Sequence, residues 1–489
     1  MLCTLIALAA ACSAAPELPA QNTLYDPNSG YADIVLLNSP VNPDRTEKST
    51  PTLDKMATID FVAHSTTGLT HESMTREEID ERISPYGRFD GRPGMPYDEY
   101  REAMEYVWLN ATDYARKPSP VAVDITKAYR YNDLVEIMKG LSCYEGVSLY
   151  DIGVSAEGRT IYALEVDVPS SKKKSTVVLT GSIHSRETAG TVFLLKELAE
   201  LLSAGTKESK EVLATTRFAV VPCCNPDGRE AVCFDAKKYT MSDGQYWKAT
   251  TNGTDLNRNF PGLVWSQVAS GNKKMATVAS APRPANYPGD HAGCAPETKA
   301  LMKFLYYYIG VEKSRILIDY HQQGALSYSG KPWSTVRQQS LCRELTDRML
   351  SVLNSGNRHK YIWVSETADY GLNGTGSTLT DYASSVAYGA KFSPGFGFCV
   401  YADGNDEYPL CAVPRADDSR VRIVEAVPGF RTMTFEIGYG RQYLGYGPET
   451  RHLLSEEYNA RHFDRVLYEV AKYCGGLRRE NLLEHLPSE

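Results

Sequence analysis

The fold prediction starts from the stretch STVVLTGSI, residues 175–183, which HSRE, residues 184–187, follows directly. A nearly continuous apolar run of this length is typical of a strand that is buried on both faces of a sheet. Residues 187–203 then show the apolar spacing of a long helix. The stretch therefore predicts a central strand with polar residues at its carboxyl end.

The same strand and helix patterns continue on both sides of this stretch. Strands are predicted at residues 147–154, 160–168, 217–223, 315–320 and 432–437, and helices at residues 131–141 and 458–474. Strands that alternate with helices indicate an α/β fold with a mixed parallel and antiparallel central sheet and helices on both faces. No internal repeat is present.

Composition limits the class of protein. The chain has 489 residues, 42% apolar and 23% charged, with a net charge of −8. These are globular values, and the length is sufficient for two or three domains. Nucleic acid is excluded as a main partner, because phosphate binding needs clustered Lys and Arg. Stable membrane insertion after signal removal is not expected, since no other long apolar run follows the N-terminal one.

The chain divides into four predicted segments. Residues 1–15 are predicted to form a signal peptide, because Leu2–Ala11 is apolar and small residues follow it; a short membrane anchor is the alternative. Residues 16–118 are an N-terminal region, residues 119–478 a catalytic domain and residues 479–489 a tail. The basic pair at residues 116–117 is either a processing site or an exposed turn. A secreted protein, in the extracellular space or the endolysosomal lumen, is expected.

Cysteines and glycosylation sequons fit export. Nine cysteines remain after the signal, and Cys399 and Cys411 are the favoured local disulfide pair because they flank a Gly/Asp-rich stretch. Sequons occur at Asn110, Asn252 and Asn373, which predicts a glycoprotein.

Three residues have the spacing of a metal site. His184 and Glu187 lie three apart at the predicted start of a helix, and His321 ends another buried strand. Two imidazoles and one carboxylate are a ligand set that catalytic zinc uses. Each residue taken alone is better explained by a structural role, as a strand-end histidine or a helix-start carboxylate.

Two further places carry polar residues suited to chemistry. Arg258, next to Asn257, presents a fork that fits a carboxylate, although a capped turn explains the same residues. Glu436 lies inside the apolar strand 432–437, where a carboxylate is costly unless it is paired or functional. Apolar surroundings would raise its pKa and suit it to general base and acid work. A buried ion pair is the alternative.

Together these motifs resemble the zinc metallocarboxypeptidase family of the carboxypeptidase A and B type. The resemblance runs in order from about residue 129 to about residue 474. It includes IGVSAEGR at residues 152–159, NPDG at residues 225–228, and Gly289 with PET at residues 296–298.

The resemblance implies a role for each matching position. The zinc ligands would be His184, Glu187 and His321, for one Zn²⁺ per chain, and Asp255 would orient His184. Asn257 and Arg258 would hold the C-terminal carboxylate of a peptide or protein substrate. Glu436 would activate the attacking water and pass its proton to the leaving amine. The implied activity is therefore that of a metallocarboxypeptidase.

The chain departs from the family pattern at two places. Lys248 occupies the position where an Arg usually stabilises the oxyanion, so a slower enzyme is expected because Lys keeps the charge without the planar fork. Ser384 falls at the position of the family's mobile Tyr. Tyr382 or Tyr388 would then serve as the mobile Tyr; the alternative for each is a structural role.

The substrate preference stays open. An insertion at about residues 394–429 is rich in acidic residues, which predicts either a pocket for basic C-terminal residues or a solvated loop. Three functions remain: a carboxypeptidase, a peptidase of the same family that cuts bacterial cell-wall peptides, and a zinc-binding or peptide-binding protein without turnover. The N-terminal region is a candidate pro-region.

Overall fold

The structure is a computed structural model that describes part of the chain. The described residues are 120–242, 244–260, 282–289, 293–329, 336–357, 360–365, 378–387, 391–393, 397–401, 409–410, 427, 429–438 and 451–480. The predicted signal peptide and N-terminal region therefore lie outside the described residues, as do Asn110, Asn373, Tyr388 and most of the insertion.

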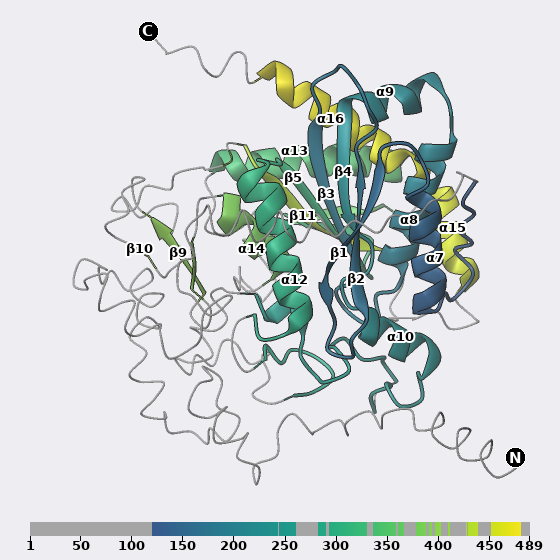
Figure 1. The fold of residues 1–489 in the computed structure, drawn as a ribbon, viewed down its shortest axis with the longest axis vertical. Helices are drawn as coiled ribbons and strands as arrows, with labels where there is room; N and C mark the ends of the chain where they lie inside the picture. The colour runs from purple at the N-terminus through teal and green to yellow at the C-terminus, as the bar shows by residue number, and fades with distance from the viewer. Residues whose placement is uncertain are drawn as a thin grey trace, which may run out of the picture.

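An eight-stranded mixed sheet forms the centre of the fold (Figure 1). Its strands are β1 (Val147–Val154), β2 (Thr160–Val166), β3 (Ser175–Gly181), β4 (Thr216–Val221), β5 (Ile316–Gln322), β6 (Leu326–Ser329), β7 (Ile362–Ser365) and β11 (Arg431–Ile437). They are ordered β1-β2-β4-β3-β5-β11-β6-β7, and the central four, β4, β3, β5 and β11, are parallel. This confirms the predicted α/β class and mixed sheet.

Burial explains why the sequence patterns were readable. In β5 every residue is buried, and Val177, Val178 and Leu179 of β3 have no exposed surface. Both strands are apolar on both faces because the sheet is covered on both sides. Strand β1 lies at the edge, and buried and partly buried residues alternate along its first four positions. The predicted strands therefore match the observed ones to within two residues at each end.

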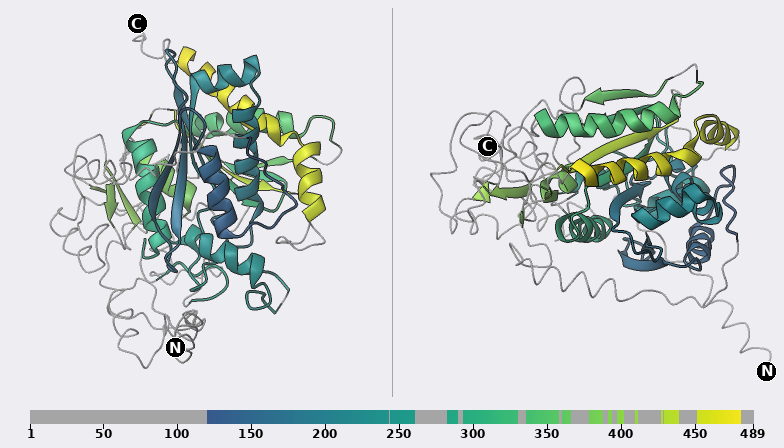
Figure 2. Two further views of the ribbon diagram at one scale, coloured as in Figure 1. Left: turned by 45° about the vertical axis from the view of Figure 1, so that its right-hand side comes forward. Right: turned by 90° about the horizontal axis from the view of Figure 1, so that it is seen from above.

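Helices cover both faces of the sheet (Figures 1 and 2). One apolar core contains residues of α7 (Tyr131–Leu141), α8 (Ala189–Ser203), α9 (Lys207–Thr215), α13 (Val336–Leu353), α15 (Arg451–Ala460) and α16 (Val466–Glu480). The other contains residues of α12 (Pro296–Leu305), the π-helical turn η6 (Tyr306–Val311) and α14 (Leu379–Ala387). Helix α10 (Pro226–Phe234) follows β4, and the short strands β8 (Lys391–Ser393), β9 (Gly397–Tyr401) and β10 (Pro409–Leu410) form a separate sheet.

The helix predicted at residues 458–474 was wrong as one element. Helix α15 ends at Ala460, the 3-10 turn η7 (Phe463–Arg465) follows, and α16 begins at Val466. His462 between them has a φ of 56°, a left-handed conformation that no α-helix continues through. Apolar residues continue on both sides of the break, and Tyr458 and Phe463 stack on each other across it. The periodicity of the sequence therefore did not reveal the break.

Among the described residues, no helix combines the length and apolar character needed to span a membrane.

Candidate metal centre

The candidate site lies where the order of strands reverses. From β3 the chain passes through α8 and α9 to β4 on one side, and β5 pairs with β3 on the other side. The crevice outside the carboxyl ends of two such strands is the usual ligand site of an α/β sheet. His184 and Glu187 follow β3, and His321 lies near the end of β5. The fold therefore brings together residues that are 134 positions apart.

The connection after β3 is held tightly against β5. Ser182 has a φ of 52°, and its Oγ donates a hydrogen bond to the Glu187 carbonyl at 2.8 Å. A Cβ on Gly190 would lie 2.9 Å from the Tyr320 carbonyl oxygen, so only glycine allows α8 to approach the strand this closely. The Gln322 Oε1 also accepts a hydrogen bond from the Ala189 amide at 3.1 Å.

The expectation that the helix begins at Glu187 was wrong by two residues. Helix α8 begins at Ala189 with Thr188 as its N-cap. The Glu187 carbonyl bonds to the Ser182 hydroxyl and so stands outside the helix, which leaves its side chain free to turn toward the two histidines.

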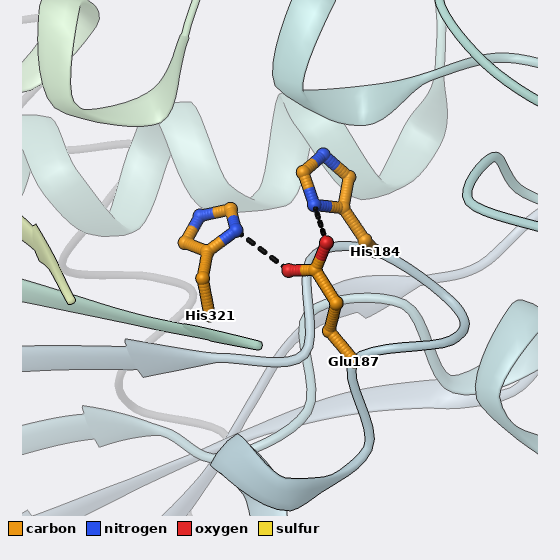
Figure 3. A group of neighbouring side chains, drawn as sticks. All are labelled: His184, Glu187 and His321. Atoms are coloured by element: carbon orange, nitrogen blue, oxygen red, sulfur yellow. Dashed lines mark hydrogen bonds and ion pairs between the residues drawn. The ribbon is translucent and has the colours of Figure 1, made fainter. Parts of the chain in front are cut away.

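The three predicted metal ligands converge (Figure 3). The Nδ1 atoms of His184 and His321 each lie 2.7 Å from one carboxylate oxygen of Glu187. One ligand atom from each of the three residues lies within 4.8 Å of the others, and all three side chains are buried. The two imidazole rings are in edge contact, with centroids 4.8 Å apart. The predicted ligand set is therefore assembled, with His184 and Glu187 in the turn between β3 and α8 and His321 on β5.

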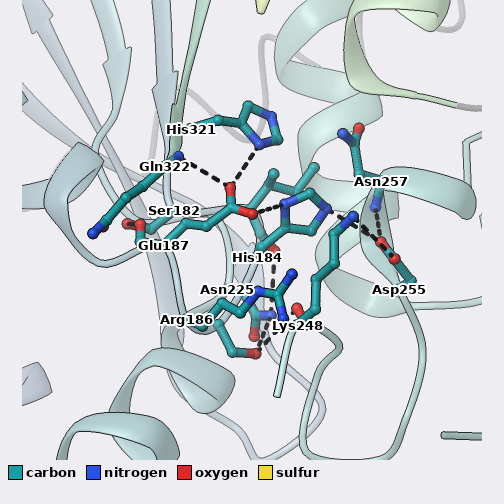
Figure 4. Close-up of polar contacts among 12 residues, drawn as sticks. Ser182, His184, Arg186, Glu187, Asn225, Lys248, Asp255, Asn257, His321 and Gln322 are labelled. Carbon is teal, nitrogen blue, oxygen red and sulfur yellow. Dashed lines mark hydrogen bonds and ion pairs between the residues drawn. The ribbon is translucent and has the colours of Figure 1, made fainter. Parts of the chain in front are cut away.

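Each histidine has an aspartate behind it. The His184 Nε2 lies 3.4 Å from Asp255 Oδ1 without hydrogen-bond geometry, and the His321 Nε2 lies 2.7 Å from Asp319 Oδ2 in a hydrogen bond (Figure 4 shows Asp255). Thr180 in turn donates to Asp319 Oδ1 at 2.7 Å. An aspartate that accepts from Nε2–H directs the Nδ1 lone pair toward a metal.

Asp319 was missed in the sequence. The spacing Asp319-x-His321 places both side chains on one face of β5, because side chains alternate along a strand. That period of two is the signal from which Asp319 could have been identified.

The electrostatics of the three ligands favour a cation between them. Burial lowers the pKa of His184. Burial alone would raise the pKa of Glu187, but His184 and His321 outweigh it and hold that pKa well below its usual value. Nδ1 lone pairs and a carboxylate repel one another unless a cation or protons lie among them. Two imidazoles, one carboxylate and supporting aspartates fit zinc.

Glu436 lies beside the triad. In the parallel register of β11 and β5, Glu436 pairs with His321. Its side chain is half-buried, while the three ligands are fully buried. Burial, with the nearby Glu187 charge, raises the pKa of Glu436 to about 8. Glu436 can therefore take up and release a proton next to the metal ligands.

A candidate carboxylate clamp lies at the other side of Asp255. The Asp255 side chain accepts from the Asn257 amide at 3.1 Å, which caps the 3-10 turn η4 (Leu256–Arg258). The Asn257 Oδ1 accepts from the Leu379 amide at 2.9 Å, so the amide orientation is fixed. Arg258 is buried, and its Nε has no hydrogen-bond partner among the described residues. A buried donor of this kind favours an incoming carboxylate.

Lys248 also faces this site. Its Nζ lies 3.8 Å from Asp255 Oδ2, and burial lowers its pKa despite the opposing charge of Asp255 (Figure 4). The structure therefore places Lys248, Asp255 and His184 in one group of contacts. The oxyanion role implied for Lys248 stays a prediction.

Of the two candidates for the mobile tyrosine, the structure describes only Tyr382. Tyr382 is fully buried, packs against Phe260, and donates to the Met302 carbonyl at 3.1 Å. This makes Tyr382 a core residue of α14, and Ser384 bonds to the Thr380 carbonyl one turn earlier. Tyr388 lies outside the described residues.

Three of the sequence motifs meet away from the metal ligands. Asp227 accepts from the Ser155 hydroxyl at 2.7 Å, the Glu157 amide at 2.8 Å and Arg159 at 2.7 Å. Glu297 accepts from the Ala156 amide at 2.9 Å. Residues 155–159, Asp227 and Glu297 are called the motif clamp below. The motifs were predicted to mark the family, and the structure shows that they bind one another.

The cysteines and sequons are only partly described. Seven cysteines lie in the described part, and none of them forms a disulfide with another of the seven: Cys143, Cys223, Cys224, Cys233, Cys294, Cys342 and Cys474. The sulfurs of the predicted Cys399–Cys411 pair and the acidic side chains of the insertion lie outside the described residues. Asn252 is half-buried, and its side chain accepts from the Thr254 amide at 3.4 Å.

Comparison with known proteins was made on sequence and on structure. The zinc carboxypeptidase model, Peptidase M14, matches residues 135–407, which include the three metal ligands, Lys248 and the clamp residues but not Glu436. Carboxypeptidase N catalytic chain of Mus musculus is 31% identical over 186 residues, covering 36% of this chain and 39% of that protein. Carboxypeptidase Z of Homo sapiens is 28% identical over 186 residues, covering 36% and 28%.

The chain thus spans well under half the length of these curated relatives. Among solved structures, bovine thrombin-activatable fibrinolysis inhibitor, in complex with tick carboxypeptidase inhibitor, superposes with a TM-score of 0.49 at 16% identity. The match covers 72% of this chain and 99% of that one. Carboxypeptidase A from Helicoverpa armigera gives a TM-score of 0.49 at 16% identity, covering 77% and 80%.

Proposed function

The chain belongs to the zinc carboxypeptidase family, Peptidase M14, and from that membership we propose that it removes C-terminal residues from peptides by zinc-dependent hydrolysis. The observation that carries the proposal is the buried cluster of His184, Glu187 and His321 with Glu436 beside it in the sheet. One Zn²⁺ per chain would be held by the three ligands.

Neighbouring carboxylates support the metal ligands. Asp319 holds the His321 ring by a hydrogen bond, and Asp255 lies 3.4 Å from the His184 Nε2, so both carboxylates favour rings whose Nδ1 atoms point inward. Bound zinc would acidify a water molecule and polarise the scissile carbonyl.

Glu436 would carry the proton. With its pKa raised to about 8 by burial, Glu436 is mostly protonated at pH 7 and about one tenth ionised, so both forms needed by a general base and acid are present. Its carboxylate would accept the proton of the attacking water and deliver it to the departing amine. Lys248 would supply positive charge for the developing oxyanion.

Selectivity for chain ends would come from the Arg258 clamp. Arg258 has an unsatisfied buried Nε, and the Asn257 Nδ2 has no partner among the described residues. A substrate carboxylate would pair with these donors, whereas the uncharged peptide bonds inside a chain would leave Arg258 unpaired. Peptide and protein C-termini are therefore the proposed substrates.

The test is cleavage of a mixed peptide library by the zinc-loaded protein, read by mass spectrometry. Stepwise loss of single C-terminal residues is expected, with none from the same peptides carrying a C-terminal amide. Glu436→Gln should lower the rate about 10²- to 10⁴-fold. Glu469→Gln, at a surface carboxylate of α16 paired with Lys472, is the matched control and should change little.

The zinc content of Glu436→Gln should equal that of the parent, because Glu436 is not among the three ligands. Absence of cleavage by the zinc-loaded parent, or equal cleavage by Glu436→Gln, would overturn the proposal.

We propose that this domain, residues 119–478, acts outside the cytosol after removal of residues 1–15. The apolar run Leu2–Ala11 and the small residues after it support export. N-terminal sequencing of the protein recovered from culture medium tests this. A start at residue 16 would support signal cleavage, and a start near residue 119 would support a removable pro-region.

A further inference from the structure

A cavity of about 660 Å³ lies at the opposite edge of the sheet from the metal ligands. Its walls come from the chain before β3 and β5, from the start of β4, and from Cys474 of α16. The metal ligands lie at the other ends of β3 and β5. The seven residues of β5 span roughly 20 Å at the usual rise of a strand. The cavity is therefore separate from the proposed active site.

The cavity is strongly cationic in an acidic chain. Its charged lining has two carboxylates, Asp167 and Glu312, and six cations: Lys172, Lys173, Lys174, Arg217, Lys313 and Arg315. The whole chain carries a net charge of −8. Positive charge gathered at one hollow of a negative protein attracts anions to that hollow. This lining is called the basic cavity below.

Three of the cations are neutralised by the protein. Lys172 pairs with Glu211 at 2.5 Å, Lys174 with Asp167 at 2.6 Å, and Arg217 with Glu312 at 2.7 Å. The two acidic groups of the lining are used in these pairs, and Arg315 has contacts of its own.

Two lysines remain without an anion. Lys173 and Lys313 are exposed lining residues, and neither ammonium group has an ion pair or hydrogen bond within the part of the chain that the structure describes. Lys313 is an exposed residue, and its partial burial lowers the pKa of its ammonium with no neighbouring charge opposing the shift.

The position of Lys313 is imposed by its neighbours. Lys313 has a φ of 56°, a conformation that a lysine rarely adopts. The Glu312 amide bonds to the Tyr307 carbonyl at 2.9 Å, and the Ser314 amide bonds to the Tyr308 carbonyl at 2.8 Å. The loop before β5 is thus pinned on both sides of Lys313, which keeps this lysine at the wall of the cavity.

We propose that the basic cavity binds a small anion carrying two or more phosphate groups, with Lys173 and Lys313 as its principal contacts. The Lys ammonium is a compact charge that binds phosphate oxygens from any direction. Two separate unpaired cations suit an anion with charge at both ends, and the cavity is large enough for a short phosphate chain. The inference goes beyond the proposed peptidase activity and does not depend on it.

The test is calorimetric titration of the full chain with sodium tripolyphosphate, with inorganic phosphate as the comparison. Saturable binding at one site is expected for tripolyphosphate, and much weaker binding for inorganic phosphate. The double variant Lys173→Ala/Lys313→Ala should weaken binding by roughly tenfold for each lysine removed.

The matched control is Lys207→Ala/Lys210→Ala, which removes the same charge from exposed positions of α9 outside the cavity lining. This control should bind within about twofold of the parent, because Lys207 and Lys210 are as exposed as Lys173 and Lys313 but lie outside the cavity lining. Circular dichroism of both double variants shows whether they fold.

No saturable heat with tripolyphosphate would overturn the proposal. Equal losses in the two double variants would do so as well, because they would indicate attraction to overall charge. Equal affinity for inorganic phosphate would refute the requirement for two phosphate groups. If the protein proves to have no peptidase activity, these outcomes still apply, because the titration needs neither zinc nor turnover.

Discussion

Glu297 of the motif clamp is a buried carboxylate that we expect to reduce stability at neutral pH. Its side chain has no exposed surface, its Oε1 accepts from the Ala156 amide at 2.9 Å, and its Oε2 has no partner among the described residues. Burial raises the pKa of Glu297 to about 7, and the charges of Asp227 and Glu157 add to the rise.

The sign of the pH dependence follows from proton binding. An unfolded Glu titrates near 4.5, so between pH 4.5 and 7 the folded protein holds a proton on Glu297 that the unfolded chain has lost. Stability from this group is therefore lost as the pH rises through that window. With a pKa of about 7 for Glu297, the free energy of unfolding is lower than that of a protein with an uncharged side chain at this position. The difference is about 1 kcal/mol at pH 5 and about 3 kcal/mol at pH 8.

The substitution Glu297→Gln should remove this loss. Glutamine keeps the shape and the oxygen that accepts from Ala156, and it carries no charge at any pH. We expect the free energy of unfolding of Glu297→Gln to exceed that of the parent by about 3 kcal/mol at pH 8 and by about 1 kcal/mol at pH 5. Urea unfolding of both proteins at both pH values, with equal metal content, measures the difference.

Glu208→Gln is the control, because Arg465 and Lys472 lower the pKa of the exposed Glu208. This control should show no stabilisation at pH 8. A difference between Glu297→Gln and the parent that stays constant from pH 5 to pH 8 would refute the reasoning, as would destabilisation at pH 8.

Three further predictions concern the metal site. Asp319→Asn should weaken zinc binding about 10- to 100-fold by releasing His321, measured by competition with a chelator, whereas the surface variant Asp347→Asn should leave it unchanged; equal affinities would contradict the role of Asp319. Arg258→Ala should lower kcat/KM on peptides with a free C-terminal carboxylate by about 10- to 100-fold, so that they are cleaved no faster than amidated peptides. If the variant still prefers free carboxylates, Arg258 is not the residue that binds them. Lys248→Ala should lower kcat by about 10²- to 10³-fold with little change in KM, and Lys248→Arg should recover it; a change in KM alone would contradict an oxyanion role.

The strands and the metal ligands could be predicted because their signals are local. Burial on both faces of β3 and β5 requires apolar residues at consecutive positions, and such runs are visible without knowledge of the partners. His184, Glu187 and His321 stood at the ends of those runs, where an α/β sheet places its ligands. The break at His462 was not predictable, because a left-handed residue leaves the apolar spacing intact.

Contacts between distant residues were decided only by the tertiary structure. The Asp319–Thr180 bond joins residues 139 positions apart, and the Glu297–Ala156 bond joins residues 141 apart. Such pairs depend on strand register and helix placement, which the local pattern of either residue does not contain. The sequence by itself determined six of the eight strands of the described sheet, but not β6 or β7, and it also determined the family motifs and the metal ligands. The packing of the sheet decided which carboxylate supports which histidine, why three motifs bind one another, and where two lysines lie without a counter-charge.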